Sequence, residues 1–184
     1  MRTFVLGGAR SGKSSLAARW AMERSQKVCC IVTAASAADG SDPEMQARIA
    51  RHHRQRPAHW RVREEPLHLG AAIREESAGD ERTLLLVDCL TLWCANCLWP
   101  PARQTEPDIA GWRRESETLV QALRACRGEI IVVSNEVGTG IVPESASARL
   151  FRDEQGWINQ AVAAECDAAF LVVAGLPLQL KPAS

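Results

Sequence analysis

The residues with the most recognisable chemistry stand near the start of the sequence, where positions 7–14 read G-x-x-x-x-G-K-S. The motif comprises Gly7, Gly8, Ala9, Arg10, Ser11, Gly12, Lys13 and Ser14. A short apolar run precedes it and a stretch of helical spacing follows, which is the strand–loop–helix context of a phosphate-binding P-loop. Inward-pointing backbone N–H groups and the positive end of the helix attract an anion there. We predict a phosphate site in preference to an ordinary glycine-rich turn.

Two side chains of this motif have specific expected roles. Lys13 supplies a positive charge for the outer phosphates, and the Ser14 hydroxyl is placed to bind Mg²⁺. A carboxylate that completes such a site follows another apolar run, residues 84–87, which ends in Asp88. Because ligands of open α/β sheets bind beyond the carboxyl ends of the strands, we predict a metal role for Asp88 rather than a capping role. The polar residues 134–138 after the next run fit either the same cleft or a simple loop.

A helix is expected over residues 41–55, because 41–44 read Ser-Asp-Pro-Glu, a strong helix start. Met45, Ile49 and His52 then share one face, whereas His53 points about 100° away. Adjacent histidines on different faces disfavour a zinc site. Nearby arginines favour a neutral, nucleophilic imidazole. From this segment alone, however, a packed histidine at a helix end is the better interpretation.

The wider pattern predicts how these residues are positioned. Apolar runs with little alternation occur at residues 3–6, 28–33, 83–87, 129–134 and 168–174, as in strands buried on both faces of a parallel sheet. Helical spacing occurs at 14–24, 112–126 and 150–166. The alternation predicts an α/β fold, with a mostly parallel sheet and helices on both faces. Residues 100–108 read as a surface loop within one domain spanning 1–184.

Composition excludes several classes of protein. The 22 basic and 22 acidic residues balance, so no basic field points to nucleic acid. No apolar run is long enough to cross a membrane, and the early P-loop leaves no room for a signal peptide. The seven cysteines fit a reducing cytoplasm. Cys94 and Cys97 have metal-ligand spacing, but without a second pair we interpret them as core residues of an apolar helix.

Four blocks, at residues 7–14, 45–60, 134–144 and 148–160, occur in an order that resembles one family over nearly the whole chain. The second block contains His-His followed by Arg-Pro-x-His-Trp, and the third contains Asn-Glu-Val-Gly. The family is that of the bifunctional adenosylcobinamide kinase/adenosylcobinamide-phosphate guanylyltransferases. Segment 93–112 matches the family poorly, and the corrinoid-binding surface is expected to include it.

The resemblance implies a RecA-like fold and two reactions of cobalamin biosynthesis. Adenosylcobinamide is first phosphorylated by ATP or GTP, and GTP then transfers GMP to that phosphate through a GMP-histidine. His52 matches this histidine, and Mg²⁺ assists the transfers. The resemblance also implies homo-oligomers, commonly trimers. It places nucleotide contacts on the P-loop and on Thr33, Ala34, Ala35, Gln55, Arg56, Glu64 and Asp88.

Two other functions remain open from the sequence. One is a P-loop kinase of another small molecule, in which His52 is only structural. The other is a nucleotide-dependent switch or assembly ATPase, which the balanced charge and the lack of charged tails support poorly.

Overall fold

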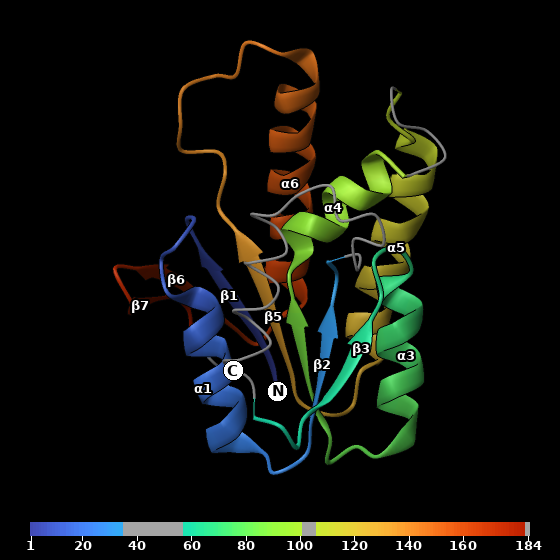
Figure 1. The fold of residues 1–184 in the computed structure, drawn as a ribbon, viewed down its shortest axis with the longest axis vertical. Coiled ribbons are helices and arrows are strands. Elements are labelled where there is room, and N and C mark those ends of the chain that lie inside the picture. Colours follow the sequence, from blue (N-terminus) through green and yellow to red (C-terminus); the bar gives the residue numbers. More distant parts are fainter. Residues whose placement is uncertain (35–56, 101–105, 183–184) are drawn as a thin grey trace.

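The computed structural model describes residues 1–34, 57–100 and 106–182, which fold around one seven-stranded sheet (Figure 1). The strand order is β3-β2-β4-β5-β1-β6-β7. The strands are β1 (Arg2–Gly7), β2 (Val28–Val32), β3 (Arg61–Glu64), β4 (Leu84–Asp88), β5 (Ile130–Asn135), β6 (Ala168–Val173) and β7 (Leu176–Lys181). The described helices are α1 (Lys13–Arg24), α3 (Leu69–Gly79), α4 (Leu90–Leu98), α5 (Ile109–Ala125) and α6 (Ala146–Glu165).

All neighbouring strands pair in parallel except β6 and β7, which form an antiparallel hairpin. The central strands β2, β4 and β5 are almost wholly buried, which explains why their sequences are continuously apolar. The sheet is therefore mostly parallel, as the sequence predicted. Its carboxyl edge collects the ends of β1, β2, β3, β4 and β5, which point upward in Figure 1.

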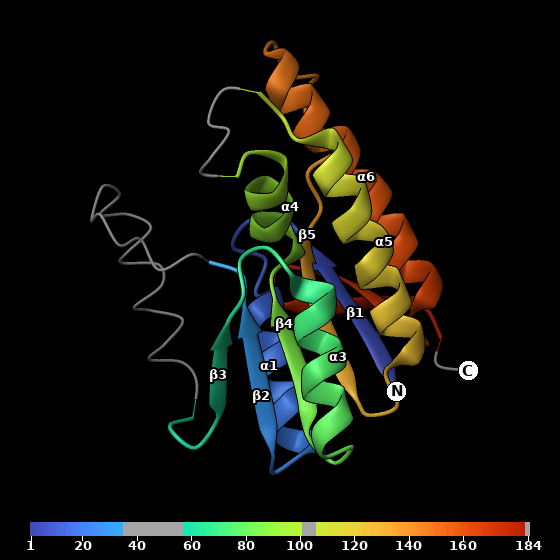
Figure 2. The ribbon, with the colours of Figure 1, turned by 90° about the vertical axis from the view of Figure 1, so that its right-hand side faces the viewer.

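Helices cover both faces of the sheet, which confirms the second part of the fold prediction. On one face, Leu16 and Ala17 of α1 pack in a cluster with Val5 and Val133. On the other face, α3, α4, α5 and α6 enclose a larger cluster that includes Phe4. Figure 2 shows α3 and α5 in front of the strands and α1 behind them. The helix α1, which begins in the P-loop motif, is thus separated by the sheet from the other described helices.

Segment 93–112, which the sequence left as part of a corrinoid-binding surface, begins and ends with buried tryptophans. Trp93 is fully buried and Trp112 is nearly so, with their ring centroids 5.0 Å apart. Cys94 and Cys97 are buried free thiols of the same core, as the sequence interpretation held. These residues of α4 and α5 thus belong to the hydrophobic core, whereas Trp99, at the end of α4, is only partly buried. Among the described helices, none has the length and apolar character needed to span a membrane.

Candidate nucleotide-binding site

The P-loop connects the end of β1 to the start of α1, and two of its glycines are required by geometry. A Cβ at Gly7 would lie 2.4 Å from Ser11 Oγ and 2.7 Å from the carbonyl oxygen of Val172. Gly12 precedes the first helical residue with a φ of 92°, a left-handed conformation that glycine adopts without strain. Its carbonyl accepts the first helical hydrogen bond, from the N–H of Leu16 at 2.9 Å. The loop therefore turns tightly and ends at a helix N-terminus, which favours an anion.

The two side chains with expected roles in phosphate and metal binding lie at the start of α1. Lys13 is only 9% exposed, and its Nζ donates to the carbonyl oxygen of Gly8 at 3.1 Å, so the ammonium group lies over the loop. Ser14 Oγ donates to Asp88 Oδ1 at 3.3 Å. Asp88 is the last residue of β4, two strands away from β1 in the sheet. The fold thus brings together the hydroxyl and the carboxylate that the sequence assigned to Mg²⁺.

These two oxygen donors match the ligand preference of Mg²⁺, which takes one or two protein groups and completes its shell with phosphate and water. Within the described ranges, no group of three or more His, Cys, Asp or Glu side chains is arranged to hold a metal ion.

Three other predicted contacts lie along the same edge of the sheet. Thr33 directly follows β2 and is fully buried, with Ala34 next in the chain. The Thr33 hydroxyl donates to the carbonyl oxygen of Cys89 at 2.6 Å and accepts from the N–H of Cys89 at 3.0 Å. This hydroxyl therefore joins the ends of β2 and β4. Glu64 ends β3, at the edge of the sheet, and is exposed.

These positions form a row from the P-loop at β1, past Asp88 at β4 and Thr33 at β2, to Glu64 at β3. Four strand spacings of about 4.8 Å give a row of about 19 Å, long enough for an extended nucleotide. The predicted residues Ala35, His52, Gln55 and Arg56 lie outside the described residues, as does His53.

A buried polar cluster lies at the end of β5; the sequence left Ser134 open between the cleft and a simple loop, and did not point to its two partners on α6. Ser134 Oγ donates to Asn159 Oδ1 at 2.7 Å, and Gln155 Nε2 donates to both Ser134 Oγ and Asn159 Oδ1 at 2.9 Å. All three side chains are at least 94% buried. The signal in the sequence was an amide pair at i and i+4 within the apolar spacing of residues 150–166. This cluster attaches α6 to the end of β5, beside the P-loop.

The turn between β6 and β7 is a second unpredicted neighbour of the P-loop. Ala174 and Gly175 both have positive φ angles, 52° and 81°, as in a two-residue hairpin turn. The N–H of Gly175 donates to the carbonyl oxygen of Ser11 at 2.8 Å. A Cβ at Gly12 would lie 3.1 Å from the Cα of Gly175. The hairpin therefore packs directly against the phosphate-binding loop.

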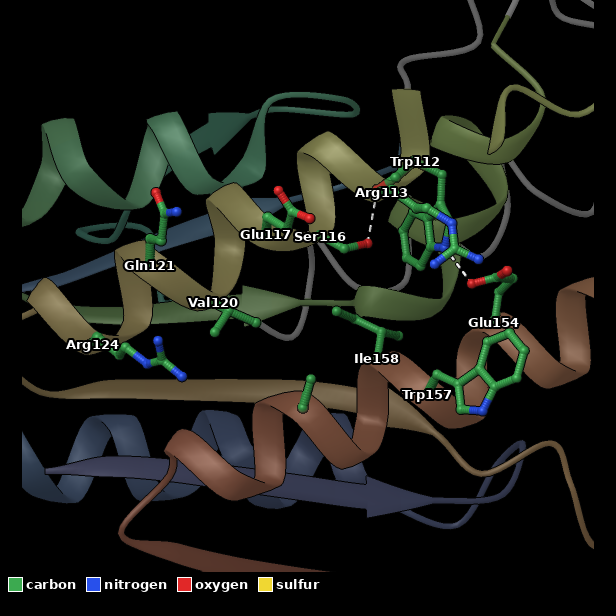
Figure 3. Close-up of a pocket in the computed structure, with 11 residues that line it drawn as sticks. Trp112, Arg113, Ser116, Glu117, Val120, Gln121, Arg124, Glu154, Trp157 and Ile158 are labelled. Carbon is green, nitrogen blue, oxygen red and sulfur yellow. Dashed lines mark hydrogen bonds between the residues drawn. The ribbon is translucent and has the colours of Figure 1, made fainter. Parts of the chain in front are cut away.

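A groove of about 390 Å³ lies between α5 and α6, on the opposite face of the sheet from α1. Figure 3 shows Trp112 and Glu154 facing each other across it, and the indole N–H of Trp112 donates to Glu154 Oε2 at 2.7 Å. None of the predicted site residues lines this groove. It is therefore distinct from the row of residues at the carboxyl edge.

The P-loop geometry, the Ser14–Asp88 contact and the mostly parallel sheet define a P-loop nucleotide-binding protein. A solved structure of an ATPase from the type III secretion system of pathogenic bacteria has the same fold, with a TM-score of 0.55 and 15% identity. The match covers 92% of this chain and 51% of that one, so this chain spans about half the length of that ATPase.

Sequence comparison identifies the family. The family described as cobinamide kinase / cobinamide phosphate guanyltransferase matches residues 3–180. A bifunctional adenosylcobalamin biosynthesis protein of Pseudomonas aeruginosa is 48% identical over 181 residues, which is 98% of each chain. A protein described in the same words from Salmonella typhimurium is 39% identical over 98% of this chain and 100% of its own. The chain belongs to the cobinamide kinase / cobinamide phosphate guanyltransferase family.

Proposed function

We propose that this protein catalyses two successive steps of adenosylcobalamin biosynthesis at the carboxyl edge of its sheet. In the first step, a hydroxyl of adenosylcobinamide attacks the terminal phosphorus of ATP or GTP, and the nucleoside diphosphate leaves. In the second step, GMP passes from GTP to the new phosphate, which gives adenosylcobinamide-GDP and pyrophosphate. The observation that carries the proposal is the contact of Ser14 with Asp88 beside a P-loop, in a chain of this family.

In the kinase step, the protein's contribution is to hold and neutralise the triphosphate. The loop N–H groups and the N-terminus of α1 bind its oxygens, and Lys13 extends its ammonium group toward them. Ser11 Oγ is buried and has no hydrogen-bond partner in the described part of the chain, so it is a further donor for a phosphate oxygen. Ser14 and Asp88 would hold Mg²⁺, which offsets the negative charge of the transferring group.

In the guanylyl step, we assign the nucleophile to His52, on the basis of the family resemblance. An imidazole nitrogen of His52 forms a bond to the α-phosphorus of GTP, and the bond from that phosphorus to the bridging oxygen breaks, releasing pyrophosphate. A phosphate oxygen of the acceptor then displaces the imidazole. Two displacements replace one difficult reaction between two anions.

The remaining predicted contacts would bind the nucleoside part of the substrate. Thr33, Ala34 and Glu64 follow in the row that leads away from the P-loop, which supports a nucleotide lying along the edge of the sheet. The Thr33 hydroxyl is bonded to Cys89, its N–H donates to the carbonyl oxygen of Asp88, and its carbonyl oxygen accepts from Asn96. We therefore assign the contact at the end of β2 to the main chain of Ala34. The family resemblance adds Ala35, Gln55 and Arg56.

We also propose that the protein assembles as a homotrimer in the cytoplasm. An apolar surface supports self-association: Leu176, Leu178 and Leu180 of the edge strand β7 are between 54% and 73% exposed, and Val173 beside them is 60% exposed. Exposed apolar edge strands are usually covered in native proteins. The seven cysteines, all free thiols in the structure, suit a reducing compartment.

The experiment that tests the proposal uses GTP labelled at the α-phosphate, with Mg²⁺ and without an acceptor. Label should remain on the denatured wild-type protein, stable in alkali and lost in acid, as a phosphorus–nitrogen bond requires. His53→Ala is the matched control and should also be labelled, whereas His52→Ala should not. Absence of label on folded, GTP-binding wild type would leave a P-loop kinase without a guanylyl step. Label on His52→Ala would place the nucleophile elsewhere.

A further inference from the structure

Asn135, the last residue of β5, lies where the two halves of the proposed site meet. β5 lies between β1, which leads into the P-loop, and β4, which ends in Asp88. In register, Asn135 is opposite Gly7, and Asp88 is opposite Val133. Asn135 is therefore beside the start of the P-loop and two positions beyond the level of Asp88.

The alternation of side chains along the strands places Asn135 on the same face as Asp88. In β5, Ile131 and Val133 belong to the cluster under α1, so Asn135, two residues further, is on that face. In β4, Leu84 and Leu86 belong to the same cluster, so Asp88, two residues beyond Leu86, also lies on the face covered by α1. Both polar residues thus project from neighbouring strands toward the face that carries the P-loop helix.

The main chain at Asn135 is held from two sides by side chains. Its N–H donates to Thr91 Oγ1 at 2.8 Å, and its carbonyl oxygen accepts from Asn159 Nδ2 at 3.0 Å. Asn159 is in turn fixed by Ser134 and Gln155 in the buried cluster. Burying three polar side chains is costly unless they are hydrogen-bonded, and a satisfied network makes its surroundings rigid. The network thus fixes the position from which the Asn135 side chain projects.

The side-chain carboxamide of Asn135 has unused hydrogen-bonding capacity. Asn135 Oδ1 is buried and accepts no hydrogen bond from any described residue. A carboxamide carries both a donor and an acceptor, so it suits a hydrated anion, in which oxygens accept and bound water donates. Asn135 lies between Gly7, where the P-loop begins, and Asp88, the proposed Mg²⁺ ligand.

We propose that the Asn135 carboxamide contacts the terminal phosphate of the bound nucleoside triphosphate, so that this residue distinguishes a triphosphate from a diphosphate. Its NH₂ group donates to a phosphate oxygen, and its oxygen accepts from water on the same group. The inference rests on the nucleotide site proposed above. This hydrogen bond to a charged group exists only in the triphosphate complex. Its loss therefore weakens the binding of the triphosphate and leaves the binding of the diphosphate unchanged.

The test compares equilibrium dissociation constants for the β,γ-imido analogue of GTP and for GDP. Both are measured in a His52→Ala background so that no GMP is transferred. Asn135→Ala should raise the constant for the triphosphate analogue about tenfold and change that for GDP by less than about twofold. Asn135→Asp is nearly isosteric but anionic, so it should repel the terminal phosphate and raise the dissociation constant of the triphosphate analogue further. Equal effects on the two nucleotides, or none, would overturn the inference.

Two controls distinguish an effect on the position of the Asn135 side chain from a general loss of the fold. Thr91→Val removes the acceptor for the Asn135 N–H at nearly constant volume and should produce a smaller loss of the same selectivity, which Thr91→Ser should restore. Thermal unfolding of each variant verifies that the fold is retained. If Lys13→Ala weakens both nucleotides and Asn135→Ala weakens neither, this inference alone fails. If Lys13→Ala weakens neither, the proposed site is wrong.

Discussion

Gly7 and Gly8 are neighbours in the P-loop, yet a methyl group would have different consequences at the two positions. At Gly7 it would meet Ser11 Oγ and the Val172 carbonyl, both within 3 Å, whereas at Gly8 it would meet nothing within 4 Å. We expect Gly7→Ala to lower the free energy of unfolding by about 2 kcal/mol, because backbone of β6 cannot move aside cheaply. Urea denaturation measures the change, with Gly8→Ala as the matched control. Equal stability of the two variants would contradict this account.

Single residues also show how much of the candidate site could be predicted from the sequence. The expected roles of Ser14 and Asp88 depended on the type of residue and on its place after a strand, and the structure places the two side chains in contact. Thr33 shows what the sequence could not predict. Its hydroxyl follows a predicted strand beside the site, but only the structure shows that this hydroxyl is bonded to Cys89. The role proposed for Asn135 depends on strand register and on α6, and neither follows from the local sequence pattern.

Among the elements, β1 and β6 are joined at their amino ends by Arg2 and Asp167. The main-chain N–H of Arg2 donates to Asp167 Oδ2 at 2.7 Å, and its guanidinium donates to Oδ1 at 2.9 Å. These hydrogen bonds, first the main-chain one and then the side-chain one, lower the pKa of Asp167 below its ordinary value of 3.8. A carboxyl group with a depressed pKa stabilises the fold above its unfolded pKa, and that stability is lost as the pH falls through the folded pKa.

Replacement of this carboxylate should therefore have a pH-dependent effect. Asp167→Asn should cost about 1 kcal/mol of unfolding free energy near neutral pH, and the difference from wild type should shrink once the pH falls below about 4. Urea unfolding of both proteins across this range measures it. Asp153→Asn, at an exposed pair with Arg152, is the control and should change little. A difference that persists unchanged at low pH would rule out the carboxylate as its source.

The strands that the sequence predicted and those that it did not differ in burial. The five predicted strands, β1, β2, β4, β5 and β6, form the interior of the sheet, where both faces select continuous apolar residues. The two edge strands were missed. β3 reads Arg-Val-Arg-Glu and is largely exposed, while β7 contains Pro177 and pairs on one side only. Edge strands lack the two-sided burial that makes an apolar run recognisable.

For the whole molecule, one domain over residues 1–184 stays a prediction, and so does the trimer. If β7 forms the subunit contact, Leu178→Glu should lower the assembled mass toward that of a single chain of 20.1 kDa, because a carboxylate would be buried against apolar surface. Light scattering after size-exclusion chromatography measures the mass. Gln179→Glu, which adds the same charge at the next residue, should leave the trimer intact. A trimeric Leu178→Glu, or a wild type that is monomeric, would exclude this interface.

The contact between Gly175 and the P-loop has a thermodynamic consequence if β7 is the subunit contact. The N–H that holds the Ser11 carbonyl belongs to the turn that begins β7, so an assembly that immobilises β7 also restricts the loop that receives phosphate. Linkage then makes the two equilibria reciprocal: triphosphate would tighten the association of subunits by the same factor by which association tightens triphosphate binding. The apparent affinity for nucleotide would rise with protein concentration, and dilution of the protein would lower it.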